Sequence, residues 1–195
     1  VHSTTKYLNG HADVVGGAAT PADPEIAGPL RWWAALLGST GSPFDSYLTL
    51  RGLRTLETRL RAHQENATQL VELLLRHPAV EKVHWEGLES HPGHEIAKAQ
   101  QDGFGAMVSF DLVGGLPAVR ALLDGLELFI LAESLGGTQS LISHPATMTH
   151  APMTAEALGI AGIGEGLVRL SVGIERTSDL VRSLDAGLER ALRAG

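Results

Sequence analysis

Lys6 lies in a segment whose residue types could hold a cofactor that carries both an aldehyde and a phosphate. The hydroxyl residues Ser3 and Thr5 precede it, and a glycine-rich run that ends at Gly16 and Gly17 follows it. A desolvated lysine amine can form a Schiff base with an aldehyde, while hydroxyl and backbone N–H groups can surround a phosphate. An exposed lysine followed by a turn would have the same residues. The local pattern leaves both interpretations open.

Arg169 is the second residue whose surroundings indicate chemistry. It interrupts the apolar segment Leu167-Val168-Arg169-Leu170-Ser171-Val172. A buried guanidinium is costly unless it is paired, and its planar shape suits two parallel hydrogen bonds to the α-carboxylate of an amino acid. The alternative is a side chain that points to solvent from the outer face of an antiparallel sheet. The residue pattern alone favours this alternative.

The elements that must position these residues are predicted from caps and periodicity. A helix begins at Asp23-Pro24 and ends at Gly38, and a short buried strand is predicted around Gly16 and Gly17, from residue 14 to residue 19. Helical spacing then runs from Pro43 to His77, which predicts one long helix. Beyond it the predicted strands span residues 80–85, 106–112, 128–131 and 167–172, and the predicted helices span residues 116–123 and 178–192. This alternation predicts an α/β fold with a sheet covered by helices on one side.

Residues 3–11 resemble the cofactor-lysine motif of the pyridoxal-phosphate enzymes of cysteine and methionine metabolism. Further blocks that resemble this family occur in the family's order over essentially the whole chain, at residues 44–48, 51–56, 103–107, 132–137, 143–150 and 168–175. Trp32-Trp33 and the segment His91-Pro92-Gly93-His94-Glu95 favour the cystathionine γ-synthase branch of the family.

The resemblance implies the architecture. It implies a fold-type I pyridoxal-phosphate-dependent transferase, similar to aspartate aminotransferase, with an α/β fold. Residues 1–64 would be the end of the cofactor domain with the start of a long linking helix, and residues 65–195 a C-terminal domain with a mainly antiparallel, helix-covered sheet. Family members carry the lysine near the middle of a longer chain. We therefore expect this chain to be the C-terminal half of a polypeptide whose N-terminal half completes the site, in a homotetramer built as a dimer of dimers.

The resemblance also implies roles for individual residues. Lys6 would bind pyridoxal 5'-phosphate and shuttle protons, and Ser3 and Thr5 would bind the cofactor phosphate; turn or cap hydroxyls are the alternative for these two. Arg169 would bind the substrate's α-carboxylate, with Ser134 nearby. Glu133 matches a position tied to the choice of reaction, where a carboxylate could receive the amino group of an amino-acid partner. An ordinary loop glutamate is the competing interpretation.

The activity implied is a γ-replacement that joins an O-acyl-L-homoserine to L-cysteine. A γ-lyase or an O-acylhomoserine sulfhydrylase on the same fold is the nearest alternative, and an inactive fragment that serves only packing or oligomerisation is another. Ala35 and Leu36 stand where the synthase branch often has an asparagine near the succinyl group. This departure makes O-acetylhomoserine or cystathionine a reasonable substrate.

Composition narrows the classes of protein. The chain has 195 residues, a formal net charge of −7 and no cysteine, so neither a basic nucleic-acid surface nor a thiol-based metal site is indicated. No apolar run approaches the roughly 20 residues of a membrane span. Two histidine pairs, His91 with His94 and His144 with His150, make a zinc site conceivable, but the turn at Pro92 argues against it. We predict no metal and a cytoplasmic location.

Overall fold

The computed structural model describes all residues from Val1 to Gly195, and these form two compact units, Val1–Thr58 and Arg59–Gly195. Helix α3, Leu56–Arg76, begins in the first unit and continues in the second. The domain boundary predicted after residue 64 falls in the same helix. The assignment of the two parts to a cofactor domain and a C-terminal domain stays a prediction.

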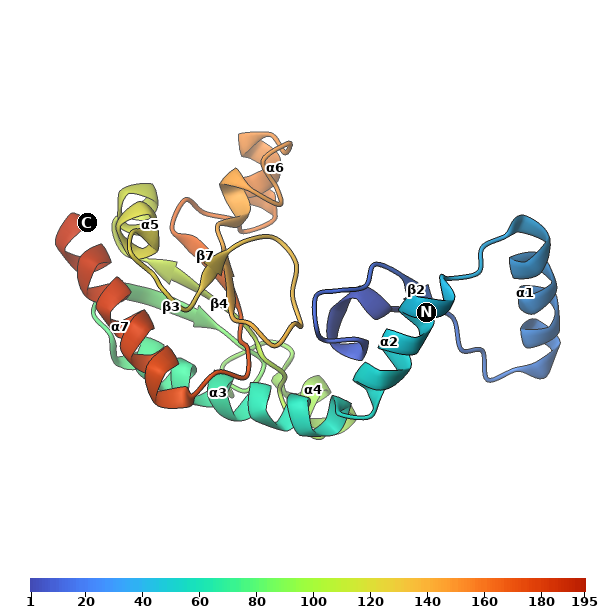
Figure 1. The fold of residues 1–195 in the computed structure, drawn as a ribbon. Coiled ribbons are helices and arrows are strands. Elements are labelled where there is room, and N and C mark those ends of the chain that lie inside the picture. Colours follow the sequence, from blue (N-terminus) through green and yellow to red (C-terminus); the bar gives the residue numbers. More distant parts are fainter. The chain divides into compact units, whose positions relative to one another are not determined.

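The first unit is built around a short hairpin-like pairing and two helices (Figure 1). Strand β1, His2–Ser3, pairs antiparallel with β2, Gly17–Ala18. Helix α1, Pro24–Leu37, begins after Asp23, whose side chain accepts a hydrogen bond from Glu25 N, and ends at Gly38, whose φ is 67°. Both predicted ends of this helix are confirmed. Helix α2, Pro43–Leu53, follows.

Two predictions for the first unit need correction. The single helix predicted from residue 43 onward is interrupted, because α2 ends at Leu53 and α3 begins at Leu56. At the interruption Thr55 donates from its backbone N at 3.1 Å and from its Oγ1 at 3.1 Å to Gly52 O; such local bonds compete with the helical ladder. The predicted buried strand is reduced to the two residues of β2, since Val15 is exposed.

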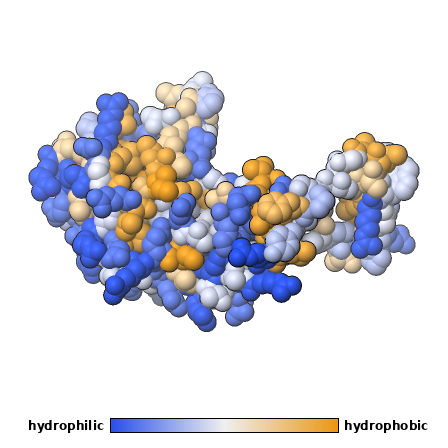
Figure 2. Space-filling model, viewed as in Figure 1, coloured by the Kyte–Doolittle hydropathy of each residue, from blue (hydrophilic) through white to orange (hydrophobic).

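Helix α1 exposes an apolar surface. None of its residues is buried, and Figure 2 shows apolar side chains gathered on the visible part of this helix. A helix that is apolar on its surface normally packs against another element. The exposed large apolar residues of α1 are Ile26, Leu30, Trp32, Trp33, Leu36 and Leu37.

The second unit contains a five-stranded sheet in the order β3-β4-β7-β6-β5. All neighbouring strands are antiparallel except β5 and β6, which are parallel. The strands are β3 Val80–His84, β4 Met107–Leu112, β5 Ile130–Leu131, β6 Leu141–Ser143 and β7 Leu167–Ser171, and the helices after α3 are α4 His94–Gln100, α5 Gly115–Leu123, α6 Ala155–Ile160 and α7 Thr177–Ala194.

One face of this sheet packs against helices. The opposite face, the polar face, carries polar side chains such as Ser109, Ser143 and Arg169 together with a few apolar ones. On β4 the side chains of Val108, Phe110 and Leu112 are buried in one core with residues of α3, α5 and α7. Helices α5 and α7 lie against each other (Figure 1). The residues that alternate with Val108, Phe110 and Leu112, such as Ser109, lie on the opposite face. The mainly antiparallel sheet with helices on one side is therefore confirmed. No helix of the chain is long and apolar enough to cross a membrane.

Candidate active-site residues

Lys6 lies in a tight turn, Thr4–Leu8, with the hydrogen-bond spacing of a π-helix. Lys6 itself interrupts the helical conformation, with φ of −93° and ψ of −136°. Its carbonyl oxygen accepts from Gly10 N at 2.8 Å, and Asn9 N donates to Thr4 O at 3.2 Å. These bonds fix the backbone on both sides of the residue that carries the amine.

Thr5 ties this turn to the glycine-rich segment. Its Oγ1 accepts from Gly16 N at 2.9 Å and donates to Gly16 O at 3.3 Å, and Thr4 N donates to the same carbonyl at 3.0 Å. Ser3 is exposed on β1, opposite Gly17. Thr5 thus has a structural role, and its hydroxyl proton would have to rotate from Gly16 O toward a phosphate oxygen, which a hydroxyl can do.

Helix α2 packs closely against the turn that carries Lys6, at Asn9. Gly52 is buried, and a Cβ added to it would lie 2.2 Å from Asn9 O. Asn9 is itself buried, and its Nδ2 donates to Asp13 Oδ1 at 2.6 Å. The glycine at position 52 therefore permits the close approach that helps to hold the Lys6 turn in place.

The donor set around Lys6 fits part of a site for pyridoxal phosphate. A primary amine on a fixed turn, with the hydroxyls of Ser3 and Thr5 within three residues of it, suits an aldehyde and a phosphate. A cavity of about 410 Å³ in the first unit lies between the segment Thr4, Val14–Ala18 and helix α2. Lys6, Ser3 and Thr5 do not line that cavity, so it does not unite the three predicted cofactor residues.

Arg169 lies on the polar face of the sheet. Its neighbours Val168 and Leu170 on β7 are buried in the core, which directs Arg169 to the opposite face. Its cross-strand partners are Ser109 on β4 and Ser143 on β6. The side chain is half-buried rather than extended into solvent.

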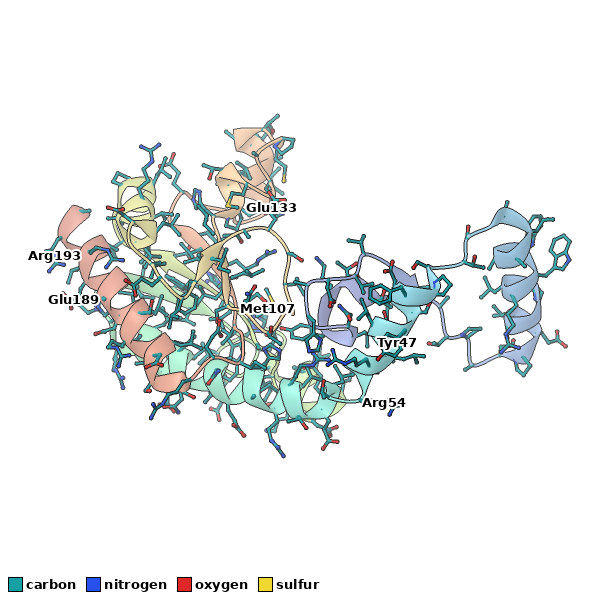
Figure 3. The ribbon with its side chains drawn as sticks, in the orientation of Figure 1. Tyr47, Arg54, Met107, Glu133, Glu189 and Arg193 are labelled. Carbon is teal, nitrogen blue, oxygen red and sulfur yellow. The ribbon has the colours of Figure 1, made fainter.

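Ser134 and Arg169 lie in contact with each other. Arg169 Nη2 donates to Ser134 O at 2.9 Å, so the contact is to the serine backbone. Ser134 has a φ of 108°, a region that favours glycine. Glu133, its neighbour on the segment after β5, is exposed (Figure 3).

The loop that carries Ser134 is fixed by residues that the sequence analysis missed. Gly136 N donates to Ser171 Oγ at 2.9 Å. The Glu175 carboxylate accepts from Ser140 N at 2.6 Å and from Ser140 Oγ at 2.8 Å, and Gly173 N donates to Ser140 Oγ at 2.8 Å. The sequence offered one signal, since Glu175 closes the last block that resembles the family. Its two-point contact with Ser140 required the structure.

Two polar residues of α3 hold the segment after β7. His63 is fully buried, and its Nδ1 lies 2.6 Å from Val172 O. Burial, with a smaller contribution from the charge of Arg59, lowers the pKa of His63. Asn66 Nδ2 donates to Gly173 O at 3.0 Å and to Glu175 O at 2.8 Å. Polar residues within an otherwise apolar helix stripe were the available signal.

The histidines considered as metal ligands have other contacts. His91 Nδ1 accepts from Gly93 N at 3.1 Å, and His94 Nδ1 lies 2.8 Å from Glu86 O. His144 Nε2 lies 3.0 Å from Glu165 O. No group of three or more histidine or acidic side chains that could hold a metal ion is present.

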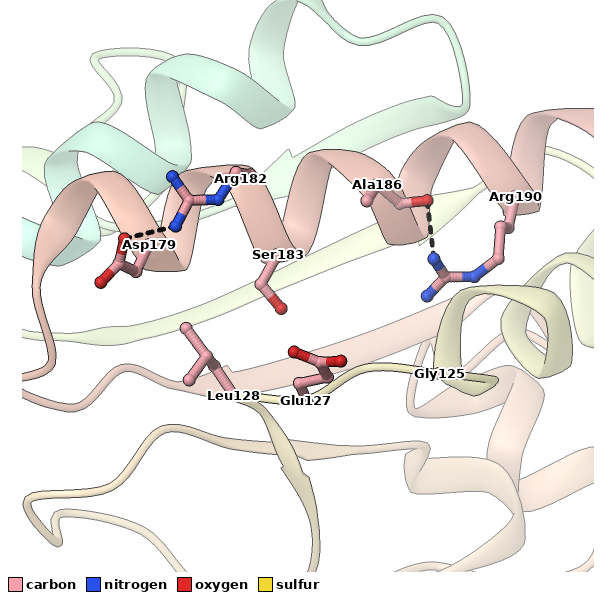
Figure 4. Close-up of a pocket in the computed structure, with 8 residues that line it drawn as sticks. All are labelled: Gly125, Glu127, Leu128, Asp179, Arg182, Ser183, Ala186 and Arg190. Carbon is pink, nitrogen blue, oxygen red and sulfur yellow. Dashed lines mark hydrogen bonds and ion pairs between the residues drawn. The ribbon is translucent and has the colours of Figure 1, made fainter.

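A groove of about 390 Å³ on the second unit lies between α7 and residues 125–128 (Figure 4). Arg190 Nη1 donates to Ala186 O at 3.1 Å, and Arg182 pairs with Asp179. Arg190 also donates to Ala121 O and Leu122 O of α5, each at 3.3 Å, so both arginines of the groove already have partners within the protein. None of the predicted site residues lines this groove.

Comparison with known proteins identifies the family. The family model described as Cys/Met metabolism PLP-dependent enzyme matches residues 1–189. Cystathionine gamma-synthase of Escherichia coli strain K12 is 53% identical over 191 residues, which are 98% of this chain and 50% of that protein. L-methionine gamma-lyase of Fusobacterium nucleatum subsp. polymorphum is 49% identical over 192 residues, which are 97% of this chain and 48% of that protein.

Solved structures agree with this result. The crystal structure of cystathionine gamma synthase from Xanthomonas oryzae pv. oryzae in complex with cystathionine has a TM-score of 0.95 and 62% sequence identity, over 100% of this chain and 50% of that one. The predicted fold class is therefore confirmed. The chain spans about half the length of the relatives that it matches.

Proposed function

The chain belongs to the family of Cys/Met metabolism PLP-dependent enzymes, and from this premise we propose that the whole protein is a cystathionine γ-synthase. It would convert an O-acyl-L-homoserine, succinylated or acetylated, and L-cysteine into L-cystathionine and a carboxylic acid. The Cγ–O bond of the homoserine ester breaks, the cysteine sulfur forms the new bond to Cγ, and the thiol proton balances the released carboxylate.

Lys6 is the residue that would hold the cofactor, and Ser3 and Thr5 would bind its phosphate. Pyridoxal phosphate, when bound, supplies an electron sink for the charge that develops at the substrate's α-carbon. The Lys6 amine would accept the α-proton and deliver protons at neighbouring carbons as a general acid and base. The turn Thr4–Leu8, closed by its own hydrogen bonds, supports this role because it fixes the backbone beneath the amine.

The observation that carries the proposal is the placement of Arg169. It lies on the polar face of the sheet, and Ser134 O holds its Nη2 at 2.9 Å. A guanidinium held in this way keeps N–H groups for a carboxylate and loses little conformational entropy on binding it. Arg169 would bind the α-carboxylate, and the exposed Glu133 would receive the amino group of the cysteine partner.

A γ-lyase or an O-acylhomoserine sulfhydrylase is the second candidate function. Two observations favour it: a lyase of Fusobacterium nucleatum is 49% identical to the chain, and Ala35 and Leu36 cannot donate side-chain hydrogen bonds to a succinyl group. The third candidate, a part that serves only packing, is favoured by the exposed apolar residues of α1.

The test uses the full-length protein. Absorbance of the bound cofactor should disappear in Lys6→Ala, and incubation with cysteine and each acylated homoserine should give cystathionine. Predominant ketobutyrate from cystathionine would instead assign the γ-lyase. If the full-length protein is colourless and Lys6→Ala does not alter its binding of pyridoxal phosphate, only the packing role is left. The homotetramer and the cytoplasmic location are parts of the same proposal, which sedimentation and cell fractionation test.

A further inference from the structure

Two buried polar atoms on the polar face of the sheet have no hydrogen-bond partner, Ser143 Oγ and Arg169 Nε. They belong to residues that face each other across strands β6 and β7. Cross-strand partners project from the same face with Cβ atoms about 5 Å apart. Ser143 is 1% exposed, so solvent does not satisfy its hydroxyl.

The two atoms are complementary. Arginine has only donors, whereas a serine oxygen has two acceptor lone pairs. A buried donor and a buried acceptor that are both left unpaired are more costly than the rotation of a hydroxyl or a small turn of a guanidinium. One shared water would also satisfy both atoms.

We propose that Ser143 is a positioning residue for Arg169, whose Nε–H donates to Ser143 Oγ directly or through one shared water. The inference rests on the proposed function, in which Arg169 binds the substrate's carboxylate. Ser134 O already holds Nη2 from the loop side. A second contact at Nε fixes the plane of the guanidinium, and the remaining N–H groups then face the carboxylate.

Ser109 provides a matched control. It is the cross-strand partner of Arg169 on the other side, on β4, and it lies on the same face. It is half-buried, and its hydroxyl is not among the buried polar atoms that lack a partner. Removal of the Ser109 hydroxyl therefore changes the same face without removing the contact at Nε.

The first test is a crystal structure of the full-length protein. Arg169 Nε within hydrogen-bond distance of Ser143 Oγ, or both atoms bonded to one water, is the expected result. A structure in which Nε donates to any other group overturns the inference. This measurement does not depend on activity, so it is separate from a failure of the proposed function, which would appear as absence of bound pyridoxal phosphate.

The second test compares two ligands that differ only at the carboxylate. Dissociation constants of L-alanine and L-alaninamide are measured through the cofactor absorbance of the full-length protein. Ser143→Ala should weaken L-alanine binding about tenfold, the effect of one hydrogen bond to a charged group, and leave L-alaninamide unchanged. Ser109→Ala should change neither ligand. Equal weakening of both ligands in Ser143→Ala, or no weakening, contradicts the inference; thermal unfolding verifies that the variants fold.

Discussion

Gly52→Ala is the change that most directly tests how the Lys6 turn is held. The added Cβ would lie 2.2 Å from Asn9 O and 2.9 Å from Asn9 C and Cα. These are backbone atoms, so no side chain can rotate away, and α2 must move from the turn. Overpacking of this kind costs about 1–3 kcal/mol. Because the contact is with backbone, we expect a loss near the upper end, about 3 kcal/mol.

Gly159→Ala is the matched control. Gly159 lies in α6, is exposed, and an added Cβ would have no atom within 4 Å outside its two chain neighbours, Leu158 and Ile160, and the backbone of its own helix. Alanine in an exposed helix is more favourable than glycine by about 0.5–1 kcal/mol. Gly52 and Gly159 are each the next-to-last residue of their helix, so the two changes make a similar gain in helix propensity and the difference between the variants isolates the steric contact with Asn9.

The assay is denaturant unfolding of the two full-length variants, together with a titration of each with pyridoxal phosphate. Gly52→Ala should lower the free energy of unfolding and weaken cofactor binding. Gly159→Ala should raise the free energy of unfolding slightly and leave cofactor binding unchanged. If both variants are equally stable and bind the cofactor equally well, α2 does not support the turn and the reasoning is wrong.

Three further predictions concern the second unit. Burial lowers the pKa of His63, so as the pH falls below about 6.5 the unfolded chain binds a proton at His63 and the folded chain does not. The free energy of unfolding should therefore fall by up to about 1.4 kcal/mol per pH unit as the pH falls. His63→Gln should remove this contribution in denaturant titrations. Glu175→Ala leaves Ser140 N and Oγ without their acceptor and should cost about 2–4 kcal/mol, whereas Glu175→Gln, which keeps one oxygen, should cost less in the same titrations. Ser134→Gly removes the strain of a φ of 108°, which is worth about 1–3 kcal/mol before the entropic cost of glycine. Its melting temperature should rise while its affinity for L-alanine falls, since the carbonyl that holds Arg169 becomes more mobile; a fall in both would contradict the strain argument.

Local chemistry predicted the elements whose ends are fixed by their own residues. Helix α1 begins at the Asp23 side chain and ends at Gly38 in the left-handed conformation, and both signals are visible in the sequence. The alternation of Val168, Arg169 and Leu170 likewise predicted a strand with one buried face. The interruption between α2 and α3 was not predicted, because the bonds of Thr55 to Gly52 O occur within an apolar pattern that continues across them.

Sequence motifs indicated the candidate site residues but not the contacts that position them. Lys6 and Arg169 are predicted site residues from their surroundings and from the resemblance, but the residues that hold them in position were not predicted. No sequence motif around Gly52 indicates its close contact with Asn9. The pairing of Ser143 with Arg169 depends on the register of β6 against β7, and a shift of one residue would have placed the serine on the other face.

The orientation of Arg169 depends on residues far from it in sequence. Ser134 O meets the guanidinium only because the loop after β5 is held over the sheet, and that loop is attached through Ser140 to the Glu175 carboxylate. Asn66 in α3 in turn holds the Glu175 carbonyl at 2.8 Å. The bonds of Ser140 and Asn66 satisfy polar groups of buried residues, which would otherwise destabilise the fold. The same bonds that stabilise the second unit therefore set the position of the guanidinium, so changes at these residues should alter both the stability of the fold and, under the proposed function, carboxylate binding.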